Sequence, residues 1–382
     1  MLGWIVWDFI VKNWALISIG VTVILLVLTP VIVIRKYVRI SYNIIKDTPP
    51  PLSMGPRDFR PLAGEPVSFR ALDGLNLQGM FHRAAEGLPR RGMILFAHEY
   101  ASEKESCARY CRPLIAAGYD VFTFDFRNHG ESSREDSYTA RQWVTEREVD
   151  DMGGALAFVQ DWLRENRLPV EVGLFGISRG AGAGIIATAD DPTVTCLCCD
   201  GVFSTDKALE RLMKRWAYIF ATVRFVYQNH PPEFWRFLRW RLLRVARRRL
   251  KCEFPSVRKV LMRSAPKPMF FIHGQRDSYI PVELALDLYA IAGQPKHLWI
   301  VNGAKHNQCV VVEPDTYARR TVAFFDRYLA GLPTPEAPID EDDLLGDWYE
   351  GSDEPPPAVV ELPSPPPRRA DAVSPTQDPT HN

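Results

Sequence analysis

The sequence predicts an α/β fold, in which a mostly parallel sheet is flanked by helices, preceded by one membrane-spanning helix. Three observations lead to this prediction. Short apolar runs, typical of strands buried on both faces, recur through the middle of the chain. Helical stretches separate these runs, and such alternation is typical of parallel strands joined by helical crossovers. An uncharged run near the N-terminus is long enough to cross a bilayer.

That uncharged run, Trp14–Ile34, matches the roughly 20 apolar residues that a helix needs to span the hydrocarbon core. A cleaved signal peptide fits poorly, because the run is long, Asp8 precedes it and no pair of small residues marks a cleavage site. Basic residues (Arg35, Lys36, Arg39 and Lys46) follow the run. The positive-inside rule therefore predicts a single-pass anchor over residues 1–46, with the rest of the chain in the cytoplasm.

Residues 47–61 are rich in proline and predict a linker, and residues 62–332 predict the folded domain. Its first strands form a hairpin around Asp73-Gly74. Further strands are expected near residues 92–98, 120–126, 171–176, 194–200, 268–274 and 297–302, with helices near 103–117, 146–165, 183–189 and 313–329. An insertion at about 203–266 interrupts this alternation. Residues 333–382 predict a disordered, Pro-rich acidic tail.

The formal net charge is +0, but it combines this acidic tail with a basic body, which favours anionic neighbours such as a lipid surface. The chain has 7 cysteines without a CxxC pair, so we expect reduced thiols and no metal site.

Gly176-Ile177-Ser178-Arg179-Gly180 matches the pattern G-x-S-x-G. The pattern follows a predicted strand and precedes a run of small residues, which is the context of a nucleophile on a tight strand-to-helix turn. Such a serine needs a base and a carboxylate that orients the base. Asp277 and His306 each follow a later strand, in the chain order Ser, Asp, His. Asp200, after the strand near 194–200, is an alternative for the acid, and His129 is an alternative for the base.

With these motifs, residues Glu65 to Leu332 resemble the α/β-hydrolase superfamily, and the run Asp125–Ser132 is similar to a loop of its serine aminopeptidase and lysophospholipase-like branch. The resemblance implies an oxyanion hole formed by the backbone N–H groups of Tyr100 and Arg179. Glu99 departs from the family, which usually has glycine there. This carboxylate either lies near the nucleophile and favours the charged form of His306, or faces solvent.

The insertion contains an Arg-rich stretch from Phe234 to Lys251 with aromatic residues between the arginines. Helical spacing places most apolar residues on one face and most arginines on the other. The helix either lies on an anionic bilayer or packs its apolar face on the folded domain, with the arginines in water. Because an anchor makes nucleic-acid binding improbable, we expect no nucleic-acid partner.

Together these features predict a membrane-anchored serine hydrolase with a helical lid. It would cleave carboxylic ester or thioester bonds, on a small-molecule or lipid acyl substrate, through an acyl-enzyme and without a metal or organic cofactor. The alternatives are a serine aminopeptidase-like amide hydrolase and a non-catalytic membrane-bound module on a hydrolase scaffold.

Overall fold

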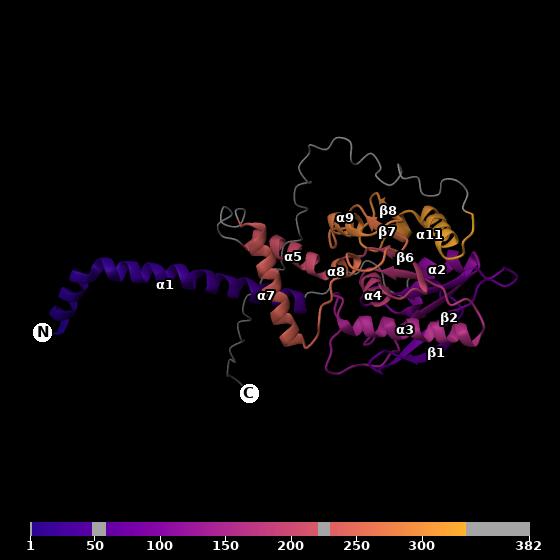
Figure 1. Cartoon of the computed structure of the whole chain (residues 1–382), viewed down its shortest axis with the longest axis horizontal. Helices are drawn as coiled ribbons and strands as arrows, with labels where there is room; N and C mark the ends of the chain where they lie inside the picture. Colours follow the sequence, from indigo (N-terminus) through magenta and orange to yellow (C-terminus); the bar gives the residue numbers. More distant parts are fainter. Residues whose placement is uncertain (1, 48–58, 221–229, 334–382) are drawn as a thin grey trace, which may run out of the picture. The chain divides into compact units, whose positions relative to one another are not determined.

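The computed structural model describes residues 2–47, 59–220 and 230–333 (Figure 1). All of the described residues belong to one compact unit. Most of the predicted linker (residues 48–58) and nearly all of the predicted tail (334–382) lie outside the described residues.

One eight-stranded sheet forms the centre of the fold, with the order β1-β2-β4-β3-β5-β6-β7-β8. The pairs β1–β2 and β2–β4 are antiparallel, and every other neighbouring pair is parallel. This confirms the predicted mostly parallel sheet. The strands are β1 (Glu65–Arg70), β2 (Asn76–His82), β3 (Gly92–Ala97), β4 (Tyr119–Phe124), β5 (Val172–Ile177), β6 (Val194–Asp200), β7 (Met269–Gly274) and β8 (Lys296–Val301).

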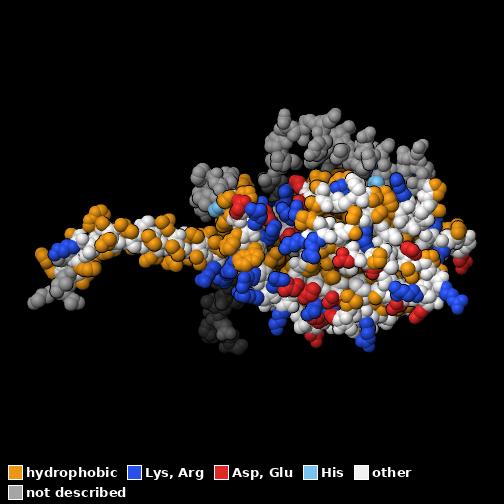
Figure 2. All heavy atoms as spheres, in the orientation of Figure 1, with side chains coloured by type: hydrophobic (Ala, Val, Ile, Leu, Met, Phe, Trp, Pro, Cys, Tyr) orange, Lys and Arg blue, Asp and Glu red, His pale blue; other side chains and the backbone are white. Residues whose placement is uncertain are grey.

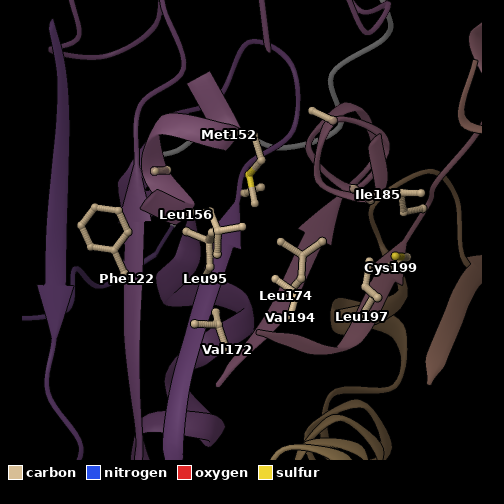
Figure 3. Packing of buried hydrophobic residues seen from close by; sticks show 14 of the residues in the cluster. Leu95, Phe122, Met152, Leu156, Val172, Leu174, Ile185, Val194, Leu197 and Cys199 are labelled. Carbon is tan, nitrogen blue, oxygen red and sulfur yellow. The ribbon is translucent and has the colours of Figure 1, made fainter. Parts of the chain in front are cut away.

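Helices cover both faces of this sheet because the apolar strands bury alternate side chains on opposite sides. On β3, Leu95 joins one apolar cluster with helices α3 (Glu146–Glu165) and α4 (Arg179–Thr188), as Figure 3 shows. Phe96 points the other way, into a cluster with α2 (Cys107–Ala116) and α11 (Pro314–Tyr328). The remaining helices of this region are η2 (Lys104–Ser106), α9 (Val282–Ile291) and α10 (Cys309–Val312). All seven cysteines lie in described parts of the chain, where each is buried and free of disulfide bonds.

The predicted span lies inside a longer helix, α1 (Leu2–Asp47). Its segment Phe9–Asn43 has 35 residues and a mean hydropathy of 2.8, and its apolar window is 0% buried. Large exposed side chains such as Trp14, Ile24 and Leu26 cover this segment. A water-exposed apolar surface of this extent is unfavourable, and the helix is long and apolar enough to cross a membrane.

The insertion contains helices α5 (Thr205–Phe220), α7 (Pro232–Leu250) and α8 (Val257–Leu261), while residues 221–229 lie outside the described part. The apolar face of α7 is buried in one cluster with α5 and with the C-terminal end of α1, formed among others by Trp235, Leu238, Leu242, Leu209, Met213, Val38, Tyr42 and Ile45. Packing within the chain, rather than contact with a bilayer, therefore covers this face of α7.

Candidate active site

Ser178 occupies the turn between β5 and α4. Its φ of 51° and ψ of −115° lie in a region that non-glycine residues rarely adopt. Small neighbours make this turn possible: a Cβ on Gly176 would lie 2.4 Å from the Ala181 Cα, and one on Gly180 would lie 2.4 Å from the Ala97 carbonyl oxygen. The Ser178 N–H donates to the Asp200 carbonyl oxygen at 2.7 Å. The turn thus holds the Ser178 side chain at the carboxyl edge of the sheet.

The loops after β7 and β8 bring two more predicted residues to Ser178. The Ser178 Oγ lies 2.9 Å from His306 Nε2, and His306 Nδ1 lies 2.6 Å from Asp277 Oδ2. The other carboxylate oxygen, Oδ1, accepts the N–H groups of Tyr279 at 2.9 Å and Ile280 at 2.8 Å. Since Nδ1 faces a carboxylate, it carries the ring proton, and Nε2 is left to accept the serine proton. The geometry matches that of a nucleophile, a base and an orienting acid.

Asp200, the alternative acid, does not bond to His306 Nδ1. It is fully buried at the end of β6, and its Oδ2 accepts a hydrogen bond from the Tyr317 hydroxyl at 3.0 Å. Its Oδ1 has no hydrogen-bond partner in the structure. Burial raises the pKa of Asp200 to about 7, since the charged form is poorly solvated there. The side chain at the base is therefore Asp277, as the sequence reasoning favoured.

The two residues expected to supply the oxyanion hole lie on segments that pack together. Arg179 begins α4, so its N–H belongs to the first turn, where backbone donors have no partner within the helix. Tyr100 follows β3, whose end approaches α4 closely at Gly180. The positive end of the α4 dipole adds to the attraction for a developing negative charge near Ser178.

The Arg179 side chain positions this loop, a role that no sequence pattern signalled. It is fully buried; its guanidinium carbon lies 5.3 Å from the ring centre of Tyr100, and its Nη2 lies 3.3 Å from His129 Nε2. His129 Nδ1 lies 2.8 Å from the Arg127 carbonyl oxygen, and its Nε2 accepts the Ala101 N–H at 3.3 Å. Burial lowers the pKa of His129. His129 is thus a neutral structural group whose ring nitrogens are both occupied, which argues against it as the base.

Glu99 is 6% exposed, so the solvent-facing alternative is wrong. Burial raises the pKa of its carboxyl group, although the positive charge of Arg109 opposes that shift. Its Oε2 has no hydrogen-bond partner in the structure. The neighbouring His98 fixes the backbone here, because its Nδ1 lies 2.6 Å from the Glu99 carbonyl oxygen and its Nε2 accepts the Phe126 N–H. Glu99 is therefore a buried carboxyl group next to Tyr100 in the loop after β3.

Among residues 2–47, 59–220 and 230–333, no cluster of three or more His, Cys, Asp or Glu side chains is arranged to hold a metal ion.

The sequence is similar to a known protein family and to several bacterial proteins. Residues 96–321 match the model of the alpha/beta hydrolase family. Uncharacterized protein YfhR of Escherichia coli O157:H7 is 25% identical over 253 residues, which are 64% of this chain and 74% of that protein. Uncharacterized protein YqkD of Bacillus subtilis is 24% identical over 261 residues, which are 66% of this chain and 76% of that protein.

Two solved structures share the fold at low identity. Esterase Pf2001 of Pyrococcus furiosus has a TM-score of 0.52 and 23% identity, covering 74% of this chain and 98% of that one. Acylaminoacyl peptidase of Pyrococcus horikoshii has a TM-score of 0.50 and 17% identity, covering 76% of this chain and 45% of that one. At these identities the likeness extends to the fold and not to the bond that is cleaved.

Proposed function

We propose, on the premise that this chain belongs to the α/β-hydrolase family, that it is a serine hydrolase acting on carboxylic esters or thioesters. The observation that carries the proposal is the pair of hydrogen bonds that joins Ser178 to His306 and His306 to Asp277, at 2.9 Å and 2.6 Å. Ser178 itself has a φ of 51° and a ψ of −115°, a strained backbone conformation of the kind that clusters at active sites.

In the first half of the reaction, Ser178 Oγ attacks the acyl carbonyl carbon while His306 Nε2 takes the hydroxyl proton. Asp277 stabilises the imidazolium that forms, and the N–H groups of Arg179 and Tyr100 donate to the carbonyl oxygen as it becomes negative. His306 then returns the proton to the leaving alcohol or thiol, which departs as the carbonyl re-forms and leaves an acyl-serine.

In the second half, water takes the place of the leaving group. His306 Nε2 removes a proton from this water, whose oxygen attacks the acyl-serine carbonyl carbon. Collapse of the second tetrahedral intermediate breaks the bond to Ser178 Oγ, which recovers its proton from His306. The products are a carboxylic acid and the original enzyme.

Labelling with a fluorophosphonate tests the nucleophile directly, since such probes phosphonylate an activated serine. We expect full-length protein to be labelled and Ser178→Ala to remain unlabelled. Ser204→Ala is the matched control, because Ser204 is also buried but its Oγ bonds to Asp206 at 2.5 Å. Labelling of Ser178→Ala at the wild-type rate would exclude Ser178 and with it the proposed mechanism.

The bond type needs a separate measurement, because the same residues also cleave amides in other enzymes. A panel of acyl esters and thioesters, compared with aminoacyl amides of the same acyl size, separates the two classes. We expect esters and thioesters to give the higher kcat/KM. Preferential cleavage of aminoacyl amides would instead identify a peptidase-like enzyme.

We further propose that α1 is a single-pass anchor and that the hydrolase domain faces the cytoplasm. The exposed apolar surface of α1 supports the anchor, and the four basic residues after Ile34 support the orientation. The protein should remain in the membrane pellet after alkaline extraction. Protease added to intact cells should spare the domain, and its digestion without permeabilisation would contradict this orientation.

The helices α5 and α7 are proposed to act as a lid for an acyl substrate. Arg215 on α5 donates to the carbonyl oxygen of Ser278, next to Asp277, at 3.3 Å. On α7, Phe237 and Trp240 are 44% and 50% exposed, beside several arginines. This combination favours contact with an anionic lipid surface.

A double substitution tests the lid. Changing Phe237 and Trp240 to serine should slow hydrolysis of a long-chain ester in anionic vesicles several-fold and leave a soluble short-chain ester unaffected. Leu88→Ser is the control, since Leu88 is 47% exposed in the turn between β2 and β3. Equal loss on both substrates would indicate a role in folding only.

A further inference from the structure

A hollow of about 250 Å³ lies between the C-terminal part of α1 and α7. A single water needs about 10–15 Å³ of such space, so the hollow has room for a group of several heavy atoms. Its walls combine four arginines with four apolar or aromatic residues: Arg35, Arg39, Arg241, Arg249, Ile34, Val38, Tyr42 and Val245. The side chains come from two helices that are far apart in the sequence and pack against each other.

The four arginines give this hollow an uncompensated positive charge. Within the described part of the chain, none of the four forms an ion pair. Other arginines of α7 are paired, as Arg236 is with Glu233 and Arg239 with Glu210. Like charges gathered around one cavity repel each other, so an anion bound there would stabilise the arrangement. Guanidinium groups suit phosphate oxygens in particular, because they donate two parallel hydrogen bonds.

The hollow also has a defined position along α1. Its first lining residue, Ile34, is the last residue of the uncharged run, and its arginines begin at Arg35. If α1 crosses the bilayer over the uncharged run, these arginines lie at the depth of the lipid headgroups. Figure 2 shows basic side chains gathered where α7 meets α1, beside the apolar surface of α1. The apolar walls at Ile34, Val38 and Val245 suit the first carbons of an acyl chain.

We propose that this hollow binds the phosphate group of an anionic phospholipid, which locks α7 against α1 at the membrane surface. The inference rests on the proposed membrane anchoring of α1 and is independent of the hydrolase reaction. A lipid phosphate would hold the arginines of both helices at once. Bound lipid would therefore couple the lid proposed above to the membrane that holds the chain.

The test uses full-length protein in a neutral detergent and titration calorimetry with dihexanoylphosphatidylglycerol. Dihexanoylphosphatidylcholine has the same chains without net charge, and glycerol phosphate has the phosphate without chains. The test variant is Arg241→Gln with Arg249→Gln. The control is Arg244→Gln with Arg248→Gln, which removes the same charge from the same helix outside the hollow. Thermal unfolding of each variant, monitored by circular dichroism, establishes that it is folded.

We expect one phosphatidylglycerol per protein for the wild type and the control pair, and binding at least tenfold weaker for the test pair. Equal weakening by both pairs would overturn the site in favour of diffuse attraction between charges. Equal binding of the phosphatidylcholine would overturn the charge argument. Glycerol phosphate that binds as tightly as the lipid, with the same dependence on Arg241 and Arg249, would support the phosphate site but overturn its lipid source.

Discussion

Replacing Asp277 by asparagine should inactivate the enzyme through the orientation of one amide. In the wild type, Asp277 Oδ1 accepts two backbone N–H groups, from Tyr279 and Ile280, while Oδ2 accepts from His306. The amide oxygen of the introduced asparagine would keep the two backbone donors, because an NH₂ group facing them would lose both hydrogen bonds. The amide NH₂ is then directed at His306 Nδ1.

An NH₂ donor at Nδ1 forces the ring proton onto Nε2, 2.9 Å from the Ser178 oxygen. A protonated Nε2 cannot accept the serine proton, so the base is lost while the packing is kept. Such tautomer reversal costs about 10⁴-fold in kcat in enzymes of this type, or about 5.5 kcal/mol in the activation barrier. If Asp277 acted only as a distant charge and did not fix the tautomer of His306, its replacement would lower kcat far less.

Asp200→Asn is the matched comparison, since Asp200 is also a buried aspartate at the end of a neighbouring strand. Its carboxylate bonds to Tyr317 and not to the base, so we expect kcat within about tenfold of the wild type, or about 1.4 kcal/mol. The assay is steady-state hydrolysis of a short-chain ester. The rate of fluorophosphonate labelling gives an independent measure of the reactivity of Ser178. If Asp200→Asn lost the larger factor while Asp277→Asn stayed within tenfold, the assignment of the acid would be refuted.

Three further outcomes are expected. Gly180→Ala should lower ester turnover at least about tenfold, because its Cβ would meet the Ala97 carbonyl oxygen at 2.4 Å and overpacking costs about 1–3 kcal/mol. Gly184→Ala would meet the side chain of Leu174 and no backbone atom, so its loss should be smaller, and equal losses would argue against the backbone clash. Burial raises the pKa of Glu99, so ionising this buried carboxyl group destabilises the folded wild type as the pH rises; Glu99→Gln should therefore gain stability relative to the wild type between pH 5 and pH 8, and an unchanged difference in urea unfolding would contradict the raised pKa. Burial raises the pKa of Asp200 from 3.8 to about 7, so between these values the folded wild type keeps a proton that the unfolded chain has released, and its free energy of unfolding falls as the pH rises. Urea unfolding at pH 5 and pH 8 should show a weaker fall for Asp200→Asn, and parallel changes in both proteins would reject this account.

The sequence alone was sufficient for features that depend on local patterns. Strands buried on both faces must be apolar at consecutive positions, which located β3 to β8 to within a few residues. Helix α3 was predicted with its observed bounds, Glu146–Glu165, and in the structure Thr145 and Glu148 form a capping box at its start. The tight turn at Ser178 excludes large neighbours, so its glycines are visible in the sequence. The uncharged run was recognised as long enough to cross a bilayer, and it lies within helix α1.

Only the tertiary structure decided which groups meet. Asp200 ends β6 and Asp277 follows β7 in the same sheet, and the loop geometry after β7 selected Asp277 as the partner of His306. The burial of Glu99 depends on how the loop after β3 packs on other segments, which its neighbours in sequence do not specify.

The packing of α7 shows the same limit. Its periodicity indicated that one face is covered, but could not distinguish a bilayer from another part of the chain. The structure places α1, from the far N-terminal end of the chain, against that face and so forms the arginine-lined hollow. Periodicity indicates which face of a helix is shielded from water. The segment that covers this face depends on contacts between distant parts of the chain, which no local pattern contains.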